Sequence, residues 1–361
     1  MHLIDFNRIF KIKRTTQIAI LSIFFALAAC KTFAISPEAS IEKAKTAPET
    51  YDPSVSILEH IADSHYWHIW GDKMIPLPII LYTDHGFEAL SSSHFGHGDE
   101  IYAGKYYTYK LVNDKVKAVD QAGKIDELAT KKVYDFSITK NVVALWIGIL
   151  LLLVIFISVA GAYKNRSNKA PKGLQSFLEP IIVFVRDDIA KPNIGYKYQR
   201  YMPFLLTIFF FILINNLIGL IPFFPGGSNV TGNIAVTFVL AVITMIVVNV
   251  NGNKYYWKHI FAPDVPVWLY PIMWPVELVG IISRPFALMI RLFANITAGH
   301  IIVLSLISLI FVFKSIAIAP VSVAFVVFMD VLELLVALLQ AFIFTLLTAL
   351  FIGTATEEHH H

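Results

Sequence analysis

The strongest constraint in this sequence is a series of long apolar runs almost free of charge. Residues 142–162 contain no charged side chain, and comparable runs cover residues 203–223, 234–250, 271–313 and 315–353. A helix needs ~20 apolar residues to cross a hydrocarbon core of about 30 Å. Hydrophobic residues make up 56% of the chain and charged residues 15%, against roughly 45–50% and 25% in soluble proteins. The sequence therefore predicts an all-α polytopic membrane protein.

The last two runs, residues 271–313 and 315–353, are each about twice as long as one perpendicular crossing requires. Each run either contains two crossings or forms one long, tilted helix. Lys314 and Pro320 mark the only strong break between the runs. We therefore expect a hairpin of two long tilted helices, which gives about five transmembrane helices in all.

The distribution of basic residues predicts the orientation of the chain. Residues 163–200 carry eight Lys/Arg against three acidic residues, so the positive-inside rule places this predicted loop in the cytoplasm. Residues 203–223 and 234–250 then form a hairpin through a Pro-Gly-Gly-Ser turn at residues 225–228, and an aromatic and basic belt between residues 255 and 270 marks the next interface. The segment before residue 140 is expected outside, with the C-terminus in the cytoplasm.

Residues 1–34 have the features of an export signal, with four basic residues before an apolar run at 18–29. Cys30 follows Leu-Ala-Ala, which resembles a lipoprotein processing box in which this cysteine becomes lipidated. Ordinary cleavage after Ala34 is the alternative, with Cys30 as a small hydrophobic residue. Because the chain has a single cysteine, it forms no internal disulfide.

Residues 35–139 differ in character from the rest and are predicted to form a small exported (periplasmic) α+β domain. Residues 35–135 hold 10 Lys/Arg and 16 Asp/Glu, with an alternating segment at 101–111 and a turn at Asp84-His85-Gly86. The segment also contains six histidines: His60, His65, His68, His85, His94 and His97. His65 and His68 have a plausible metal-ligand spacing. No carboxylate or cysteine completes a known pattern, so we expect packing or surface roles and no metal site.

Several polar residues interrupt the last two apolar runs. The first of these runs contains Glu277, Arg284, Arg291, Asn295 and His300, and the second contains Asp330, Glu333 and Gln340. An arginine at the centre of a bilayer costs ~2.5–3.5 kcal/mol on insertion scales. Such residues therefore mark either buried ion pairs or a path for ions.

Helical phase separates these residues into two groups. At roughly 100° per residue, Glu277, Arg284, Arg291 and Asn295 lie within roughly 40° of one another, whereas His300 lies on the opposite side from Arg291. Glu277 and Arg284 are about 10 Å apart along the axis, so they could instead form a pair that only stabilises the hairpin. Arg291 has no carboxylate three or four residues away. Its counter-charge must come from elsewhere.

In the following run, Glu333 and Gln340 are seven residues apart and share one face of a helix to within roughly 20°.

The sequence resembles subunit a of the membrane (Fo) sector of F-type ATP synthases. The resemblance is carried by the ten residues from Arg291 to His300 (RLFANITAGH), the segment LQAFIF at 339–344 and the terminal residues 357–359. The resemblance covers roughly residues 140–359, and these motifs are more specific than hydropathy.

This resemblance implies roles for individual residues. Arg291 matches the essential arginine of the family, Asn295 and Gln340 match polar channel residues, and Glu277 matches a carboxylate fourteen positions before the arginine. Some family members have Glu and then His where this chain has His300 and, later, Glu333. An exchange that keeps one acid and one imidazole suggests that these two side chains meet.

The family mechanism then supplies the missing anion, a carboxylate on a rotating c-ring. Arg291 remains protonated and blocks direct proton flow between two offset half-channels. The half-channel from the exported side is lined by His300, Glu333 and Asn295. The half-channel towards the cytoplasm is lined by Glu277, with Arg284 as a supporting residue. The expected partners are the c-ring, the subunit b peripheral stalk, the rest of the complex and the lipid bilayer, in a bacterial inner membrane.

Other functions are also considered. A Na⁺-coupled subunit a remains open, and a secondary transporter is less favoured because the sequence shows no internal repeat of the kind such proteins use. A membrane-anchored binding protein would leave the charged stripe without a purpose. A net charge of +3 and the absence of nucleotide or catalytic motifs indicate no nucleic acid, no cofactor, no bound nucleotide and no catalytic residues. The long exported extension of this chain resembles those of Bacteroidetes-type members of the family. The terminal residues His359, His360 and His361 are either native or an added tag.

Overall fold

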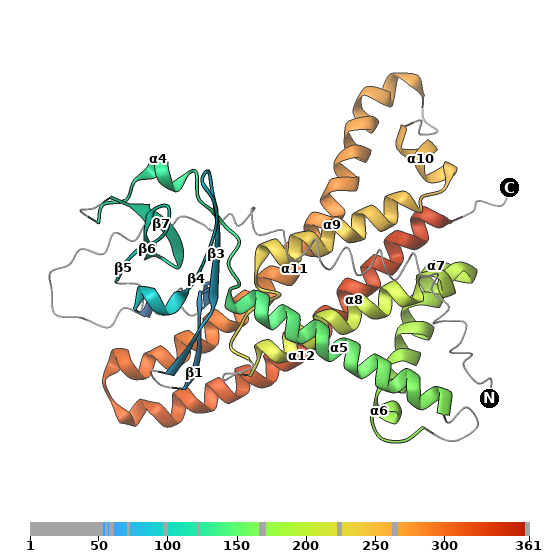
Figure 1. The fold of residues 1–361 in the computed structure, drawn as a ribbon. Coiled ribbons are helices and arrows are strands. Elements are labelled where there is room, and N and C mark those ends of the chain that lie inside the picture. The colour runs from blue at the N-terminus through green and yellow to red at the C-terminus, as the bar shows by residue number, and fades with distance from the viewer. Residues whose placement is uncertain are drawn as a thin grey trace.

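The computed structural model describes residues 53–54, 57, 61–70, 73–96, 100–120, 123–165, 171–221, 226–261 and 266–357. The predicted export signal, Cys30, His60, His97 and the terminal histidines lie outside the described residues. Short strands come first in the chain and long helices follow (Figure 1). The predicted fold class is confirmed: a helical membrane protein with a small N-terminal region of β-sheets.

The described part of the N-terminal region contains three antiparallel sheets, in the orders β1-β2, β4-β3-β8 and β5-β6-β7. The strands are β1 (Tyr66–Trp70), β2 (Lys73–Pro76), β3 (Pro78–Thr83), β4 (Gly86–Ser91), β5 (Ile101–Ala103), β6 (Thr108–Val112), β7 (Lys115–Val119) and β8 (Tyr134–Asp135). Thr83 pairs with Gly86 across β3 and β4, so the predicted Asp84-His85-Gly86 turn closes this hairpin. A short helix, α4 (Glu127–Thr130), precedes β8.

Alternation along β3 gives this region its own core. Ile79 and Leu81 are fully buried between more exposed neighbours, as expected for a strand whose successive side chains point to opposite faces. Phe95 and Tyr109 complete the same buried cluster. Apolar packing between these sheets therefore gives β3 and its neighbours a core separate from that of the membrane helices.

A buried histidine and a partly exposed acid contribute to the same region. His65 Nε2 lies 3.3 Å from Asp135 Oδ2, and the Ser137 backbone N–H donates to Asp135 Oδ1 at 2.8 Å. Burial alone raises the pKa of Asp135, but the imidazole and the Ser137 hydrogen bonds outweigh it and lower that pKa to about 2. His65 thus has the structural role expected for these histidines.

The rest of the described chain is helical. The helices are α5 (Lys140–Asn165), α6 (Leu174–Phe184), α7 (Lys191–Ile194), α8 (Tyr198–Gly219), α9 (Ile234–Val250), α10 (Lys254–Phe261), α11 (Tyr270–Phe313) and α12 (Ala319–Thr356). Among the described residues, four helices or continuous helical segments are long and apolar enough to cross a membrane. A fifth crossing is possible if α9 and α10, which meet at a bend of 104°, are taken together. This agrees with the predicted number of about five.

The segment predicted as a basic loop, residues 163–200, is instead mostly helical. Helix α6 continues through a π-helical turn at Val185–Ala190 into α7 and then α8. Leu178, Ile182, Val185 and Ile189 form a buried row at helical spacing. The high content of charged residues concealed this apolar face, which packs against the bundle while the basic side chains remain near its surface.

Helices α11 and α12 form the predicted hairpin of two long helices (Figure 1). Each is continuous, so the alternative of two crossings in each run is excluded for these described residues. Lys314 ends α11 in a left-handed conformation with φ of 48°, and Pro320 lies in the first turn of α12, where its missing N–H is not needed. Both residues therefore act at the break that the sequence predicted.

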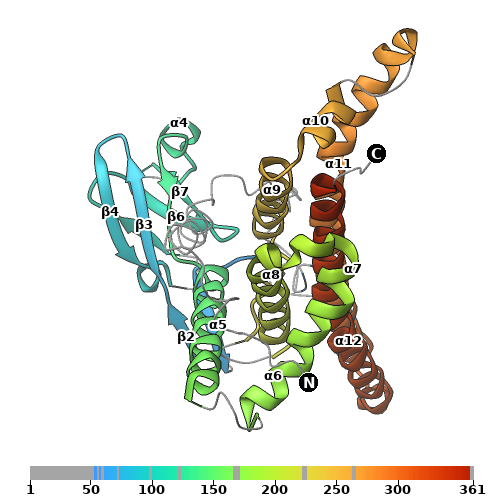
Figure 2. The same cartoon turned by 90° about the vertical axis from the view of Figure 1, so that its right-hand side faces the viewer.

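Helix α8 lies between α5 and α12 (Figure 2). Small residues on α12 allow this close packing, because Ala337, Ala341, Ala349 and Gly353 are all buried. A β-carbon at Gly353 would lie 1.9 Å from the Asn193 carbonyl oxygen. The bundle is therefore specified by close backbone approach as well as by apolar burial.

Candidate functional site

Arg291 lies about midway along α11, roughly 30 Å of helix from either end at 1.5 Å per residue. Its side chain is exposed, and large apolar residues such as Phe286 and Ile290 are exposed beside it. Within the described part of the chain, no ion pair or hydrogen bond reaches its guanidinium. Arg291 is therefore a permanent charge on an otherwise apolar helix surface, without an internal counter-ion.

Asn295 lies one turn after Arg291 on the same exposed face of α11. On the adjacent face, Leu288, Leu292 and Ile296 form a buried row. The next position in this row, four residues further, is His300. His300 therefore faces the interior of the bundle, whereas Arg291 faces outward. The predicted opposite orientation of Arg291 and His300 is thereby explained by packing.

His300 and Glu333 meet between α11 and α12. His300 Nδ1 lies 2.6 Å from Glu333 Oε1, and the two side chains are 19% and 5% exposed. This confirms the contact inferred from the exchanged acid and imidazole. A carboxylate next to an imidazole within hydrogen-bond distance can pass a proton in either direction.

Two glycines bring the backbone close to this pair. A β-carbon at Gly299 would lie 3.0 Å from the carboxyl group of Glu333, and one at Gly219 would lie 3.9 Å from His300 Nε2. Gly299 belongs to α11 and Gly219 ends α8. The pair is therefore enclosed by backbone from a third helix as well as by its own hairpin.

A buried polar group beside the pair was not identified from the sequence. Thr231 Oγ1 donates to Asn216 Oδ1 at 2.6 Å, and Asn216 Nδ2 donates to the Ala337 carbonyl oxygen at 3.3 Å. Ala337 lies one helical turn after Glu333. The signal in the sequence is an Asn-Asn pair inside the apolar run at 203–223, which carries no charge to distinguish it.

Glu277 has a different neighbour from the one considered in the sequence. His259 Nδ1 on α10 lies 3.6 Å from Glu277 Oε1, with side-chain exposures of 68% and 21%. The alternative pair of Glu277 and Arg284 is not an ion pair in the structure. The sharp bend after α9 brings α10 against α11, and such a tertiary contact could not be predicted from helical spacing.

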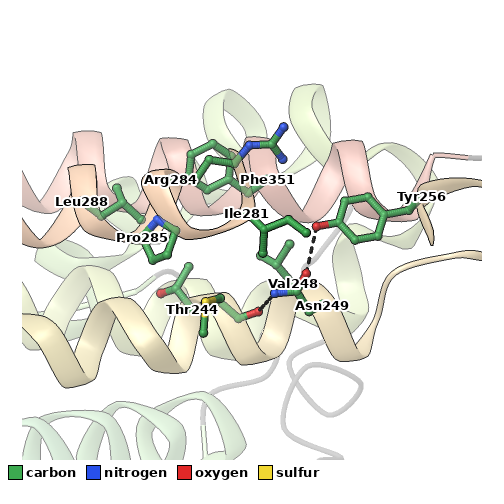
Figure 3. Close-up of a pocket in the computed structure, with 10 residues that line it drawn as sticks. Thr244, Val248, Asn249, Tyr256, Ile281, Arg284, Pro285, Leu288 and Phe351 are labelled. Carbon is green, nitrogen blue, oxygen red and sulfur yellow. Dashed lines mark hydrogen bonds between the residues drawn. The ribbon is translucent and has the colours of Figure 1, made fainter. Parts of the chain in front are cut away.

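Arg284 instead packs on an aromatic ring. Its guanidinium carbon lies 5.6 Å from the centre of the Phe351 ring on α12, a cation–π geometry. Figure 3 shows Arg284 and Phe351 above a small pocket between α9 and α11, with the Tyr256 hydroxyl bonded to Asn249. This interaction supports the helix packing that positions the neighbouring Glu277.

Gln340 is buried on the face of α12 that packs against α8. It shares a face of that helix with Glu333, as predicted, whereas Arg291 and Asn295 lie on an exposed face of α11. The polar residues therefore do not form one continuous cluster within this chain. Among the described residues, no group of three His, Cys, Asp or Glu side chains could hold a metal ion.

Comparison with known proteins places these features in a family. The family described as ATP synthase A chain matches residues 142–353, more than half of the chain. A domain of unknown function matches residues 56–136, the N-terminal region of β-sheets.

Similar proteins named ATP synthase subunit a come from several bacteria. The one from Chloroherpeton thalassium is 50% identical over 233 residues, which cover 63% of this chain and 69% of the relative. The one from Chlorobium phaeobacteroides strain DSM 266 is 41% identical over 288 residues, covering 77% and 82%. The one from Myxococcus xanthus is 43% identical over 235 residues, covering 63% and 75%. The chain belongs to the ATP synthase subunit a family, whose members are non-catalytic Fo subunits of that complex.

Proposed function

We propose that this chain carries protons between two offset half-channels that meet a rotating ring of c subunits, and so couples proton flow to ATP synthesis. The observation that carries the proposal is Arg291. Its guanidinium lies at mid-helix on an exposed apolar surface and has no counter-ion among the described residues. A carboxylate that another polypeptide carries past this surface supplies the missing charge.

The arginine acts as an electrostatic switch in this mechanism. A passing protonated carboxyl group releases its proton when it pairs with Arg291, because the guanidinium keeps its charge at every relevant pH. The same charge repels a proton that would otherwise cross directly from one half-channel to the other. The membrane potential contributes about 2.3 kcal/mol per proton per 100 mV.

The half-channel from the exported side uses the buried pair of His300 and Glu333. Their 2.6 Å separation permits proton exchange between imidazole and carboxylate. Asn216 and Thr231 extend polar contacts from this pair towards the segment that joins α8 and α9. Asn295 acts nearer the ring, where it shares the exposed face of Arg291, and Gln340 acts on the buried face of α12 that carries Glu333.

The half-channel towards the cytoplasm uses Glu277 with His259. His259 is largely exposed and Glu277 is mostly covered, at 3.6 Å from each other. A histidine at the surface can exchange protons with the solvent near neutral pH and pass them to the carboxylate. Arg284, held on Phe351, keeps α11 and α12 packed at this end.

The proposed orientation has the N-terminal region outside and the C-terminus in the cytoplasm of a bacterial inner membrane, with Cys30 as a possible lipid attachment site. The excess of basic residues in the segment 163–200 supports it. In Figure 1 the strands lie at the end of α5 where that helix begins, and the end of α12 lies at the other side of the bundle. The subunit b stalk and the remaining complex are the other proposed partners.

ATP-driven proton pumping in inverted membrane vesicles tests the proposal. Arg291→Ala is expected to lower pumping at least a hundredfold with normal assembly, because an ion pair at about 4 Å contributes roughly 4 kcal/mol at an effective dielectric constant of 20. Arg200→Ala removes an exposed arginine of α8 and is the matched control. Normal pumping by Arg291→Ala would reject the mechanism. If pumping requires Na⁺ at constant pH, the ion carried is Na⁺ and not the proton.

A further inference from the structure

The N-terminal region inserts one aromatic side chain into the membrane bundle. Trp67 on β1 is 3% exposed and belongs to the same buried cluster as residues of α5 and α8. Its register partner on β2, Ile75, packs against that cluster too. This face of the β1-β2 hairpin therefore contributes to the core of the helical bundle, whereas β3 and its neighbours have a separate core.

Trp67 also makes a specific polar contact there. Its indole Nε1 donates to the carbonyl oxygen of Gly226 at 3.1 Å, in a buried environment. Gly226 opens the described segment 226–233, which leads into α9. A β-carbon at Gly226 would lie 2.1 Å from the Ile221 carbonyl oxygen, so the backbone at this point is tightly confined.

The segment 226–233 is buried although it has no regular secondary structure over most of its length. Ser228, Asn229, Val230 and Thr231 are all buried. Buried backbone and side-chain polar groups require partners, and those in an irregular segment cannot all be supplied by the segment itself. The bond from Trp67 is one of the contacts that define its position.

The same segment contacts both helices that carry the proton-exchange pair. Thr297 Oγ1, one turn before His300 on α11, donates to the Gly232 carbonyl oxygen at 3.4 Å. Thr231 reaches the backbone of α12 next to Glu333 through Asn216. A β-carbon at Gly219 would lie 3.3 Å from the Ser228 carbonyl oxygen, close to His300. The segment therefore forms one wall around the pair.

This wall carries polar atoms that could serve an ion path. Ser228 Oγ and Asn229 Nδ2 are buried and make no hydrogen bond within the described chain. Leaving such an atom unsatisfied is unfavourable, and buried polar atoms in proteins commonly bind water. A wall with free donors and acceptors suits a hydrated route to His300 and Glu333.

We propose that Trp67 is a positioning residue for the half-channel on the exported side. The β1-β2 hairpin holds segment 226–233 through the Trp67–Gly226 bond, and that segment holds the polar wall against His300 and Glu333. The N-terminal region is thus a structural part of the ion inlet rather than an independent attachment. This inference rests on the proposed function, because it assigns the inlet to the side where the strands lie.

The test is Trp67→Phe in the complete ATP synthase, reconstituted in proteoliposomes with the pH set separately on the two sides. Phenylalanine retains one six-membered aromatic ring and removes the five-membered ring with its N–H donor. Loss of one hydrogen bond, about 1 kcal/mol, is expected to lower proton flow by up to about fivefold. Trp146→Phe makes the same chemical change on α5, where Trp146 is 47% exposed, and is expected to behave like the wild type.

The side of the membrane on which the pH dependence of proton flow changes distinguishes a positioning role from general instability. We expect a shifted dependence of proton flow on pH at the side of the strands and an unchanged dependence on pH at the other side. Hydrogen exchange at residues 226–233 should become faster. If Trp67→Phe does not assemble, Ile75→Val loosens the same hairpin and should shift the same pH dependence by less.

An unchanged pH dependence in the assembled variant, with unchanged exchange at residues 226–233, overturns the inference. In that case Arg291→Ala still abolishes pumping, and the proposed function stands. If Arg291→Ala pumps normally, the proposed function fails and the inlet role fails with it. A loss of flow with equal effects at both sides of the membrane also rejects a positioning role for Trp67.

Discussion

Exchange of His300 and Glu333 is the most direct test of the site. The two side chains lie 2.6 Å apart between α11 and α12. We expect His300→Ala and Glu333→Ala each to lose most proton pumping, whereas the double variant with Glu at 300 and His at 333 recovers much of it. The exchanged variant keeps one acid and one imidazole in contact, so their chemistry is retained although their helices are reversed.

The size of the effect follows from burial. Removing one member of a buried ion pair costs about 3–5 kcal/mol, because the remaining charge has no partner. Applied in full to proton transfer, this cost corresponds to a roughly 150- to 5,000-fold lower rate of pumping in His300→Ala. His300→Glu places two acids at the same contact and is expected to be at least as severe. The exchanged variant should show a coupling free energy of about 2–3 kcal/mol in a double-mutant cycle.

The assay is ATP-driven acidification of inverted vesicles, with the amount of assembled subunit measured in the same membranes. Thr354→Glu, with His300 and Glu333 unchanged, adds an acid at an exposed position of α12 and is the control for a general effect of charge. If the exchanged variant is no more active than its single substitutions predict, the pair does not function through contact. If His300→Ala is not assembled, its role is packing.

Two further predictions concern positions with contrasting surroundings. Gly299→Ala places a β-carbon 3.0 Å from the carboxyl group of Glu333, and overpacking of about 1 kcal/mol or more should lower pumping roughly fivefold. Gly280→Ala on the same helix meets open space and should have no effect, so equal activities would refute the argument. The lowered pKa of Asp135, about 2 against an ordinary 3.8, contributes about 1–2 kcal/mol to stability above pH 4 that is lost as pH falls towards 2. Hydrogen exchange of β3 and β8 in Asp135→Asn should show a smaller acid-dependent increase, and an unchanged acid profile contradicts this assignment.

Helix length and composition were sufficient to predict most of the membrane fold. The helices α9 and α11 begin and end within a residue of the predicted runs, and Lys314 and Pro320 mark the break before α12. The prediction of a loop at residues 163–200 was wrong. The many charged residues of this segment conceal a row of buried apolar residues at helical spacing. Across this segment the buried row lies among charged side chains that stay partly or fully exposed, such as Arg186 and Lys191, and composition alone cannot separate the two faces.

The site shows the same division. Helical phase predicted that Arg291 and His300 face opposite ways, and the exchanged residues predicted that His300 meets Glu333. The partner of Glu277 was not predicted, since His259 arrives from a helix that follows a bend of 104°. Asn216 was missed because an uncharged amide in an apolar run has little effect on hydropathy.

The sequence by itself determined that this chain crosses a membrane, that its last two helices are unusually long and that a fixed positive charge lies at mid-helix. These properties depend on the transfer of residues from water to hydrocarbon and on a period of roughly 3.6 residues per turn, both of which are local. Only the tertiary structure decided which polar groups meet. The hydrogen bond between Trp67 and Gly226 joins residues that are 159 positions apart in the sequence. Such contacts depend on how helices and strands pack, which no local pattern specifies.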